Sequence, residues 1–496
     1  MNLASIIETH PDEAVAVVWR GEPTTYAQLR ALVGGARGGL VAHGVQAGDR
    51  VALLCGNTRH FVVGYLAAIG IGAVCVPLNP FDPSPALEHE LASVEAAAVV
   101  VDGNGASGWA GVDRARVPSV RLVIAAGADI DGADTSLDEV CSAAPVPTVE
   151  RVDADLACLL FTSGTAGAPR AAMLTHGCLK ANIDQAQRVP EAMNASDVVL
   201  CVLPLHHVFG LNVALGQTLA VGSSIVLVQR FDPATALDTI AERGITVVPG
   251  APPMWVSWSA FTEAAPDAFK GVRLALTGAA AMPPDAMRAF EARFGLPLRE
   301  GYGLTEASPV VTTSVGMTPR PGSVGRVLPG VKVRVVDSEG ADALVGDPGE
   351  IWVQGPNVFP GYWRDAEATA RVLDAQGWLH TGDVALADED GFLWLVDRAK
   401  DLIIVSGFNV YPAEVEEIIA EHPGVAECAV VGVAHPHTGE AVKAYVVARK
   451  GVELVEEQIV RHCTDHLARY KCPTKVLIVD ELPRNAAGKL LRRILR

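Results

Sequence analysis

The sequence predicts an α/β fold in which a large N-terminal domain, built of layered α/β subdomains and a β-rich subdomain, precedes a small α+β domain. Short apolar runs recur over the first 320 residues, and many end in Gly, Pro, Asn or Asp before a helix-like segment. Buried strands of parallel sheets have this pattern. After Gly322 short strands alternate with Gly and Pro, and near Asp397 the pattern changes again. These two changes mark the predicted domain organisation.

The individual elements follow in chain order. Residues 25–44 carry apolar side chains at helical spacing, with Thr24 or Thr25 as the cap and Gly44 as the stop. Apolar runs predict strands at 51–55, 73–78, 97–101, 122–125, 156–161, 198–203, 224–228, 246–248, 274–276, 331–336, 350–353, 429–433 and 444–447, with late helices at 414–422 and 456–467. We therefore predict an N-terminal domain over 1–398, with α/β subdomains to about 320 and the β-rich subdomain over 321–398, and a C-terminal domain over 399–496.

The composition excludes several classes of protein. The 496 residues carry a formal net charge of -18, and binding to duplex nucleic acid requires a basic surface, so we expect no nucleic acid partner. Nine cysteines include no C-x-x-C pair, which favours reduced thiols in a cytoplasmic protein. The uncharged stretches 61–81 and 198–229 are divided by turn residues, so we expect no membrane span. Peripheral membrane contact stays open, as does the choice between monomer and homodimer.

Residues 159–176 contain the most informative motif. An apolar strand runs into a loop with hydroxyls and two glycines, then a cation, then a helix-like segment. Gly164 and Gly167 allow backbone N–H groups to approach an anion closely. Further donors come from three hydroxyls and one guanidinium, on Thr162, Ser163, Thr165 and Arg170. The loop therefore predicts a phosphate site that is not of the Walker type, and an ordinary glycine-rich turn is the alternative.

This segment closely resembles the phosphate loop of the adenylate-forming superfamily, which includes acyl-CoA synthetases, luciferases and peptide-synthetase adenylation domains. The superfamily pattern is T-S-G-T-[TS]-G-x-P-K-G, and this chain departs from it at Ala166, Arg170 and Ala171. Arg170 keeps the positive charge but replaces a point charge by a planar, bidentate donor. The resemblance covers nearly the whole chain, and the block at 405–412 is similar in particular to bacterial fatty-acyl-CoA ligases.

Residues 300–306, Glu-Gly-Tyr-Gly-Leu-Thr-Glu, resemble the second superfamily motif. The resemblance implies that Tyr302 lies flat against the adenine, that Thr305 meets the α-phosphate and that Glu306 binds Mg²⁺. A carboxylate suits Mg²⁺, which prefers oxygen ligands shared with phosphates. A polar turn after a strand is the alternative reading of the motif.

The resemblance also implies where the acid and the adenine bind. His207 matches a histidine or aromatic position that gates the acyl carboxylate, although a buried core histidine is the alternative. Small residues are implied to leave room beside the nucleotide and the acid, and these are Gly278, Ala279, Ala280, Gly301 and Gly303. A tight strand-to-helix turn would explain the first three equally well.

Three further motifs follow in the superfamily's order. Asp383 is implied to accept hydrogen bonds from the ribose hydroxyls, and Arg398 to meet ribose or phosphate oxygens, while Lys400 occupies the hinge position of a mobile C-terminal domain. The residues implied to face CoA are Ser406, Gly407 and Phe408. Lys489, after Gly488, is implied to stabilise charge that develops during adenylation. Surface ion pairs, a structural loop and a frayed basic tail are the respective alternatives.

Together these motifs imply an ATP-dependent, AMP-forming acyl-CoA synthetase that uses ATP, Mg²⁺ and CoA. The expected substrate is a carboxylic acid, with a medium or long fatty acid preferred over an aryl acid. A carrier-protein thiol as acceptor is one alternative, and a non-catalytic nucleotide- or acyl-AMP-binding protein, supported by Ala166 and Arg170, is another. The enzyme reading requires that the loop after Phe161, Glu306 and Lys489 converge around one nucleotide.

Overall fold

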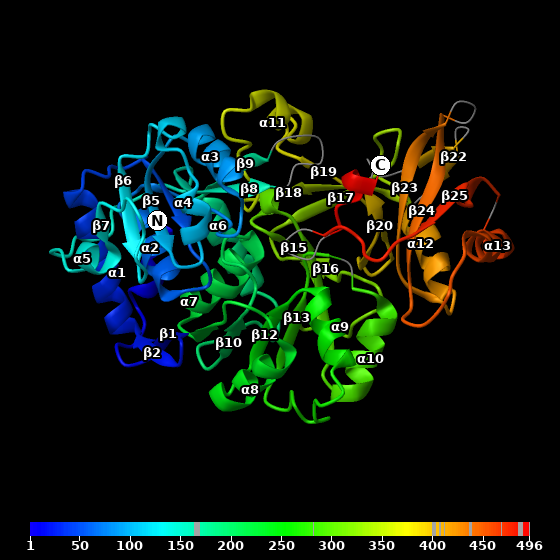
Figure 1. Cartoon of the computed structure of the whole chain (residues 1–496), viewed down its shortest axis with the longest axis horizontal. Helices are drawn as coiled ribbons and strands as arrows, with labels where there is room; N and C mark the ends of the chain where they lie inside the picture. The colour runs from blue at the N-terminus through cyan, green and yellow to red at the C-terminus, as the bar shows by residue number, and fades with distance from the viewer. Residues whose placement is uncertain are drawn as a thin grey trace. The chain divides into compact units, whose positions relative to one another are not determined.

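The chain folds into two compact units of mixed α and β structure, which confirms the predicted fold class. The computed structural model describes residues 1–162, 169–280, 282–398, 403–405, 408–410, 412–435, 439–467, 469–484 and 490–495. The first unit comprises Met1–Lys332 with Val353–Leu379, and the second comprises Val333–Trp352 with His380–Arg496 (Figure 1). The predicted domain boundary at 398/399 stays a prediction.

A seven-stranded sheet forms the N-terminal part of the first unit. Its strand order is β7-β6-β5-β3-β4-β8-β9, and every neighbouring pair is parallel except β8 and β9. The strands are β3 (Arg50–Leu54), β4 (Val74–Pro77), β5 (Ala96–Asp102), β6 (Leu122–Ala126), β7 (Thr135–Ser136), β8 (Leu156–Thr162) and β9 (Arg170–Thr175). The strands predicted from apolar runs are confirmed here because burial on both faces makes each of them continuously apolar.

Helix α1 (Tyr26–Ala42) shows how the sequence sets both the ends and the packing of an element. Thr25 caps it in a capping box with Gln28, as the predicted helix start requires. A Cβ on Gly35 would lie 1.9 Å from the carbonyl oxygen of Cys141, and one on Gly38 would lie 2.0 Å from that of Ala144. The glycines therefore let the segment that begins at α5 (Leu137–Cys141) lie directly against the helix.

A nine-stranded sheet forms the rest of the first unit, in the order β16-β15-β14-β13-β12-β10-β11-β1-β2. Its strands are β1 (Val15–Trp19), β2 (Glu22–Thr25), β10 (Val198–Cys201), β11 (Ser224–Leu227), β12 (Val247–Gly250), β13 (Leu274–Thr277), β14 (Leu298–Gly303), β15 (Val310–Thr313) and β16 (Arg326–Val327). Strands β10 to β14 run parallel, and β15 then pairs antiparallel with β14. The second motif therefore lies at the carboxyl end of a parallel strand, where α/β sheets commonly bind ligands.

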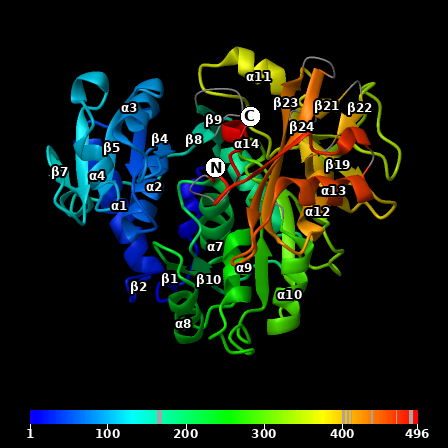
Figure 2. The same cartoon turned by 45° about the vertical axis from the view of Figure 1, so that its right-hand side comes forward.

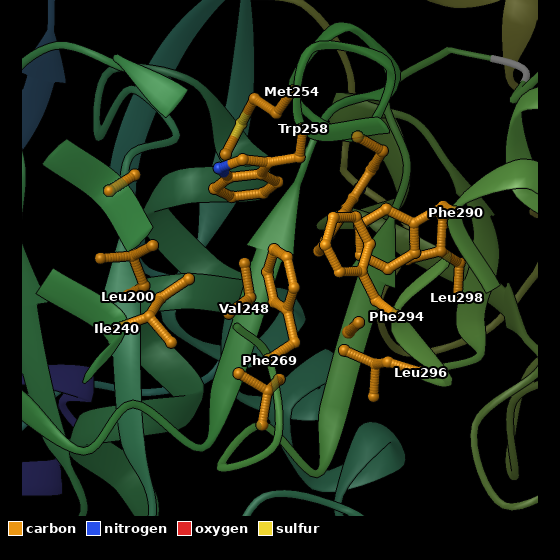
Figure 3. Close-up of a cluster of buried hydrophobic side chains, with 14 of the residues drawn as sticks. Leu200, Ile240, Val248, Met254, Trp258, Phe269, Phe290, Phe294, Leu296 and Leu298 are labelled. Atoms are coloured by element: carbon orange, nitrogen blue, oxygen red, sulfur yellow. The ribbon is translucent and has the colours of Figure 1, made fainter. Parts of the chain in front are cut away.

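An aromatic core stabilises one face of this sheet. Helices α9 (Pro252–Ala260) and α10 (Pro284–Phe294) pack against each other, and α8 (Pro233–Arg243) packs against α9 (Figure 2). The core contains Trp258 of α9, Phe290 and Phe294 of α10, and Phe269 from the connection between α9 and β13 (Figure 3). Trp258 and Phe269 meet edge to face, with ring centroids 5.2 Å apart, an arrangement that aromatic pairs prefer.

The second unit contains two smaller sheets. One has the order β17-β18-β19-β20, and the other has β22-β21-β24-β23 with β25 beside β24. The strands are β17 (Lys332–Val336), β18 (Gly349–Gln354), β19 (Leu379–Ala387), β20 (Leu393–Arg398), β21 (Ile403–Val405), β22 (Phe408–Val410), β23 (Val425–His435), β24 (Gly439–Ala448) and β25 (Lys475–Ile478), with helices α12 (Pro412–Glu421) and α13 (Glu456–His466). Both late helices were predicted. No helix of the described ranges is long and apolar enough to cross a membrane.

Candidate functional site

The described ends of the predicted phosphate loop form an antiparallel hairpin. Strands β8 and β9 pair so that Thr162 lies opposite Arg170, and the Thr162 hydroxyl donates to the carbonyl oxygen of Arg170 at 3.3 Å. The predicted loop residues Ser163, Gly164, Thr165 and Gly167 lie outside the described residues. Their contacts with phosphate therefore stay predictions, while the hairpin fixes where the loop leaves and rejoins the sheet.

Arg170 forms an ion pair that the sequence did not predict. Its Nε donates to Oδ2 of Asp365 at 2.9 Å. The other carboxylate oxygen, Oδ1, accepts the backbone N–H of Ala368 and so caps helix α11 (Ala366–Val372). The Ala368 N–H, followed by the hydrogen bond and charge of Arg170, lowers the pKa of Asp365 below its ordinary value. The carboxylate is therefore ionised at neutral pH and holds the guanidinium beside β9.

The segment 357–365 connects Arg170 with Glu306, although the two residues are far apart in sequence. The segment adds to the edge of β9, since Met173 N–H donates to the Gly361 carbonyl at 3.0 Å and Trp363 N–H donates to the Ala171 carbonyl at 2.8 Å. At its other end Phe359 N–H donates to the carbonyl oxygen of Glu306 at 2.9 Å. The 357–365 segment thus joins two motifs that the sequence expected to meet.

Glu306 lies in a short 3₁₀ turn, Thr305–Ala307, and its carboxylate is held from the 357–365 segment. The Tyr362 hydroxyl donates to Oε1 of Glu306 at 2.7 Å, and the side chain of Asn357 donates to the Ala307 carbonyl at 2.9 Å. Burial and the nearby Glu306 charge raise the pKa of Tyr362 above its ordinary value. Tyr362 therefore keeps its proton and remains a donor to the carboxylate.

The donor chemistry of Glu306 suits the predicted Mg²⁺. Within the described part of the chain no group of three or more His, Cys, Asp or Glu side chains could hold a metal by itself. Mg²⁺ commonly takes only one or two protein carboxylates and completes its shell with substrate phosphates and water. A single carboxylate therefore fits this ion, and Glu306 is the residue that would hold it.

The residues expected near adenine lie at the ends of β13 and β14. Gly278 is buried, and a Cβ there would lie 3.3 Å from the Phe209 ring and 3.7 Å from the Gly301 carbonyl. Tyr302 is buried at 7% exposure, whereas Gly303 is exposed. The structure therefore brings Gly278 and Gly301 together, and a larger residue at position 278 would press on Phe209.

The other small residues of this region are exposed. Ala279 and Ala280 lie at the surface, and Ala279 adopts a left-handed backbone with φ of 70°. Only a few per cent of non-glycine residues adopt such a conformation. The turn predicted after β13 is therefore present, and it carries local strain.

His207 lies just before the helical segment Phe209–Gly216. Its Nδ1 accepts the backbone N–H of Phe209 at 3.2 Å, and its side chain is half-buried. Burial lowers the pKa of the neighbouring His206 to about 3. His206 is therefore neutral, so it adds no charge beside His207 at neutral pH.

The second unit holds the residues implied to bind ribose. Asp383 on β19 lies opposite Arg398 on β20 in the antiparallel register, so the structure brings these two positions together. Glu350 stabilises β19 just before Asp383, because its Oε1 accepts the Gly382 N–H at 2.8 Å and its Oε2 accepts the Trp352 indole N–H at 3.1 Å. Phe408 begins β22. Lys400, Ser406, Gly407 and Lys489 lie outside the described residues.

Sequence reasoning missed four side chains of these sites. Tyr362 and Asp365 hold Glu306 and Arg170, Glu350 holds β19 at Gly382, and buried Glu300 accepts the backbone N–H of Met282. Gly361-Tyr-Trp363 after Pro360 and Gly349-Glu-Ile351 were visible signals. The contacts of these four side chains with Gly382, Glu306, Arg170 and Met282 join residues 18 to 195 positions apart, which no local pattern encodes.

Fold and site together define an enzyme that binds a nucleoside triphosphate. The AMP-binding enzyme model matches residues 3–363, and the model of the AMP-binding enzyme C-terminal domain matches residues 414–489. The chain belongs to the AMP-binding enzyme family, and the predicted adenylate-forming superfamily is confirmed.

Relatives of known name match nearly the whole length of this chain. A feruloyl-CoA synthase from Amycolatopsis sp is 37% identical, with 97% of this chain and 94% of the relative covered. A long-chain-fatty-acid–CoA ligase from Yersinia pestis is 34% identical, with 99% and 94% covered. The ATP-bound crystal structure of MatB from Rhodopseudomonas palustris matches with a TM-score of 0.92 at 35% identity, covering 100% and 98%. These matches confirm the predicted enzyme class, an AMP-forming acid–thiol ligase with ATP, Mg²⁺ and CoA as its expected components.

Proposed function

We propose that this protein converts a medium or long fatty acid, ATP and CoA into acyl-CoA, AMP and pyrophosphate through an acyl-adenylate. The observation that supports the proposal most directly is the 357–365 segment, which contacts both Glu306 and the strand that carries Arg170. A carboxylate for Mg²⁺ and a cation for phosphate are the two groups that adenylation needs near the α-phosphate. The similarity to a long-chain-fatty-acid–CoA ligase supports the choice of acid.

In the first half-reaction a carboxylate oxygen of the acid attacks the α-phosphorus, and the bond to pyrophosphate breaks. Arg170 holds the phosphates together with the loop hydroxyls and amides of Ser163, Gly164, Thr165 and Gly167, while Thr305 meets the α-phosphate. Mg²⁺ bound to Glu306 would neutralise phosphate charge. Lys489 stabilises the charge on the departing oxygen. Positioning and charge stabilisation supply most of the rate enhancement in such transfers.

The remaining residues position the substrates. Tyr302 with Gly278, Ala279, Ala280, Gly301 and Gly303 borders the adenine, and Asp383 with Arg398 holds the ribose. His207 gates the acid. In the second half-reaction the CoA thiolate attacks the acyl carbon and AMP leaves, with Ser406, Gly407 and Phe408 facing CoA after rotation at Lys400.

An aryl acid is the second candidate substrate. The similarity to a feruloyl-CoA synthase favours it at slightly higher identity than the fatty-acid ligase. Gly278 beside the Phe209 ring agrees with this candidate, because an aromatic acid could stack on a ring that no side chain at 278 covers.

Acid-dependent AMP release separates these candidates. The purified protein is supplied with ATP, Mg²⁺ and CoA, and with dodecanoate, palmitate or ferulate in turn. We expect kcat/KM to be highest for one of the fatty acids, and a higher value for ferulate would favour the aryl-acid candidate. AMP release that requires a carrier protein in place of CoA would contradict the proposed acceptor. Absence of acid-dependent pyrophosphate exchange into ATP with every acid would contradict the enzyme itself.

A further inference from the structure

The carboxylate of Glu306 is oriented by one phenol. In the part of the chain that the structure describes, hydrogen bonds reach the carboxylate only at Oε1, from the Tyr362 hydroxyl at 2.7 Å. The Phe359 ring packs edge to face on Tyr362, with centroids 5.0 Å apart, and is 1% exposed. Because the phenol ring is packed and its backbone is paired to β9, the hydroxyl is a fixed donor that selects one carboxylate rotamer.

The guanidinium of Arg170 is oriented by Asp365 in a similar way. Asp365 is fixed because its other oxygen caps α11 through Ala368. The ion pair uses Nε of Arg170, whereas a guanidinium carries four more N–H donors on its two Nη atoms. An arginine can therefore be held by a carboxylate and still present a planar fork to a phosphate. A lysine at this position would offer a single ammonium for both partners.

We propose that Tyr362 and Asp365 are positioning residues that hold Glu306 and Arg170 at a fixed separation for one Mg²⁺–triphosphate. This inference rests on the proposed function. Both positioning residues belong to the 357–365 segment, whose backbone is paired to β9 at Gly361 and Trp363. The same segment of backbone therefore positions both the metal-binding carboxylate and the phosphate-binding cation. Neither positioning residue needs to touch the substrate to act.

The metal dependence of ATP binding tests the role of Tyr362. Calorimetric titration with ATP is performed in excess Mg²⁺ and again in EDTA, without acid or CoA. In Tyr362→Phe we expect ATP to bind about 10-fold more weakly in Mg²⁺ and unchanged in EDTA, since the lost hydrogen bond serves only the metal-binding carboxylate. Tyr26→Phe is the matched control, because it removes a buried tyrosine hydrogen bond to the Ser223 carbonyl in the same unit. For Tyr26→Phe, the ratio of the ATP affinity in Mg²⁺ to that in EDTA should equal the wild-type ratio.

Asp365→Asn tests the second role. The amide oxygen can still cap α11, but Arg170 loses its negatively charged partner. We expect ATP to bind about 5-fold more weakly both in Mg²⁺ and in EDTA, because the cation acts on phosphate directly. Asp232→Asn is the matched control, since Asp232 caps α8 through Thr235 without this ion pair. Asp365→Glu, which restores the charge, should recover part of the lost affinity.

The results distinguish a failure of the proposed function from a failure of the positioning role. Wild-type protein that binds no ATP, or binds it equally with and without Mg²⁺, would overturn the proposed function. If Glu306→Gln abolishes the metal dependence while Tyr362→Phe keeps it in full, the proposed function stands and the positioning role of Tyr362 is wrong. Thermal melting of each variant confirms that the compared proteins are folded. A Tyr362→Phe protein that loses affinity equally in Mg²⁺ and EDTA would also contradict the metal-specific role.

Discussion

At the scale of single residues, Glu300 combines burial with incomplete hydrogen bonding. Its side chain is 4% exposed, and Oε1 accepts the Met282 N–H at 3.2 Å. Among the described residues nothing donates to Oε2, and the hydroxyl of Thr277, opposite Glu300 on β13, is buried without a partner as well. Burial raises the pKa of Glu300 to about 7 from 4.5. The ionised form of this carboxyl group is therefore less favourable in the folded protein than in water.

This leads to a prediction for stability. A raised folded-state pKa means that the folded protein binds the proton more tightly. The contribution of Glu300 to stability is therefore greatest below about pH 4.5 and is lost as the pH rises through about 7. Replacement by a neutral amide removes this fall. Relative to wild type, Glu300→Gln should gain about 2 to 3 kcal/mol in unfolding free energy between pH 5 and pH 8. Urea unfolding at the two pH values measures the difference.

The control for this variant is Glu242→Gln at an exposed position of α8. Its stability relative to wild type should be the same at pH 5 and pH 8 within a few tenths of a kcal/mol. An equal response of both variants to pH would show that Glu300 does not carry a buried proton.

At the scale of elements, side chains of β18 and β19 hold the part of β19 that carries Asp383. Glu350 accepts from the Gly382 N–H and from the Trp352 indole. The Thr381 hydroxyl donates to the Ile351 carbonyl at 2.7 Å and accepts the Asp383 N–H at 3.1 Å. Side chains thus hold β19 at Thr381, Gly382 and Asp383.

Glu350→Ala should therefore raise the KM for ATP about 10-fold with little change in kcat. Loss of two hydrogen bonds to a charged group frees β19 at Gly382, and a ribose contact made equally in ground and transition states affects KM alone. Steady-state rates at varied ATP measure both constants. Glu339→Ala, in the exposed turn after β17, is the control and should leave both unchanged. A fall in kcat without a rise in KM would contradict the assigned role of Asp383.

The elements also show what the sequence could and could not predict. Strands such as β3 and β5 were predicted because burial on both faces leaves a continuous apolar run. The 357–365 segment has no such pattern, and its importance comes from Arg170, 195 residues away from Asp365. Likewise the motif at 300–306 identified Glu306 from its type, whereas the hydroxyl that aims it lies 56 residues further on. Local patterns encode elements and site chemistry, but side-chain orientation depends on long-range contacts.

At the scale of the whole molecule, an acidic protein is proposed to bind three anionic substrates. The formal net charge is -18, so long-range electrostatics oppose their approach, and affinity must come from local donors. Arg170 shows the principle, because Asp365 balances its charge locally through Nε and a guanidinium has further N–H donors on its two Nη atoms. Screening by salt should therefore assist substrate association rather than hinder it.

The C-terminal unit has anchors on both sides of the proposed catalytic lysine. Arg484 pairs with Glu427 at 2.9 Å, and Arg492 pairs with both oxygens of Glu416 at 2.6 and 2.7 Å. Leu482 and Leu495 are buried against Ala429 and Val431 of β23. The chain before residue 485 and after residue 489 is therefore attached to the same sheet of this unit.

Lys489→Ala should separate the two half-reactions. We expect pyrophosphate exchange into ATP to fall by about 100-fold or more, because a lysine that stabilises leaving-group charge is worth several kcal/mol. Thioester formation from supplied acyl-AMP and CoA should stay within about 3-fold of wild type, since no pyrophosphate leaves in that step. Lys450→Ala, at an exposed position of the same unit, should change neither rate. Equal losses in both half-reactions would mean that Lys489 supports the fold of its unit or acts in both steps, and the assignment of one lysine to adenylation alone would be wrong.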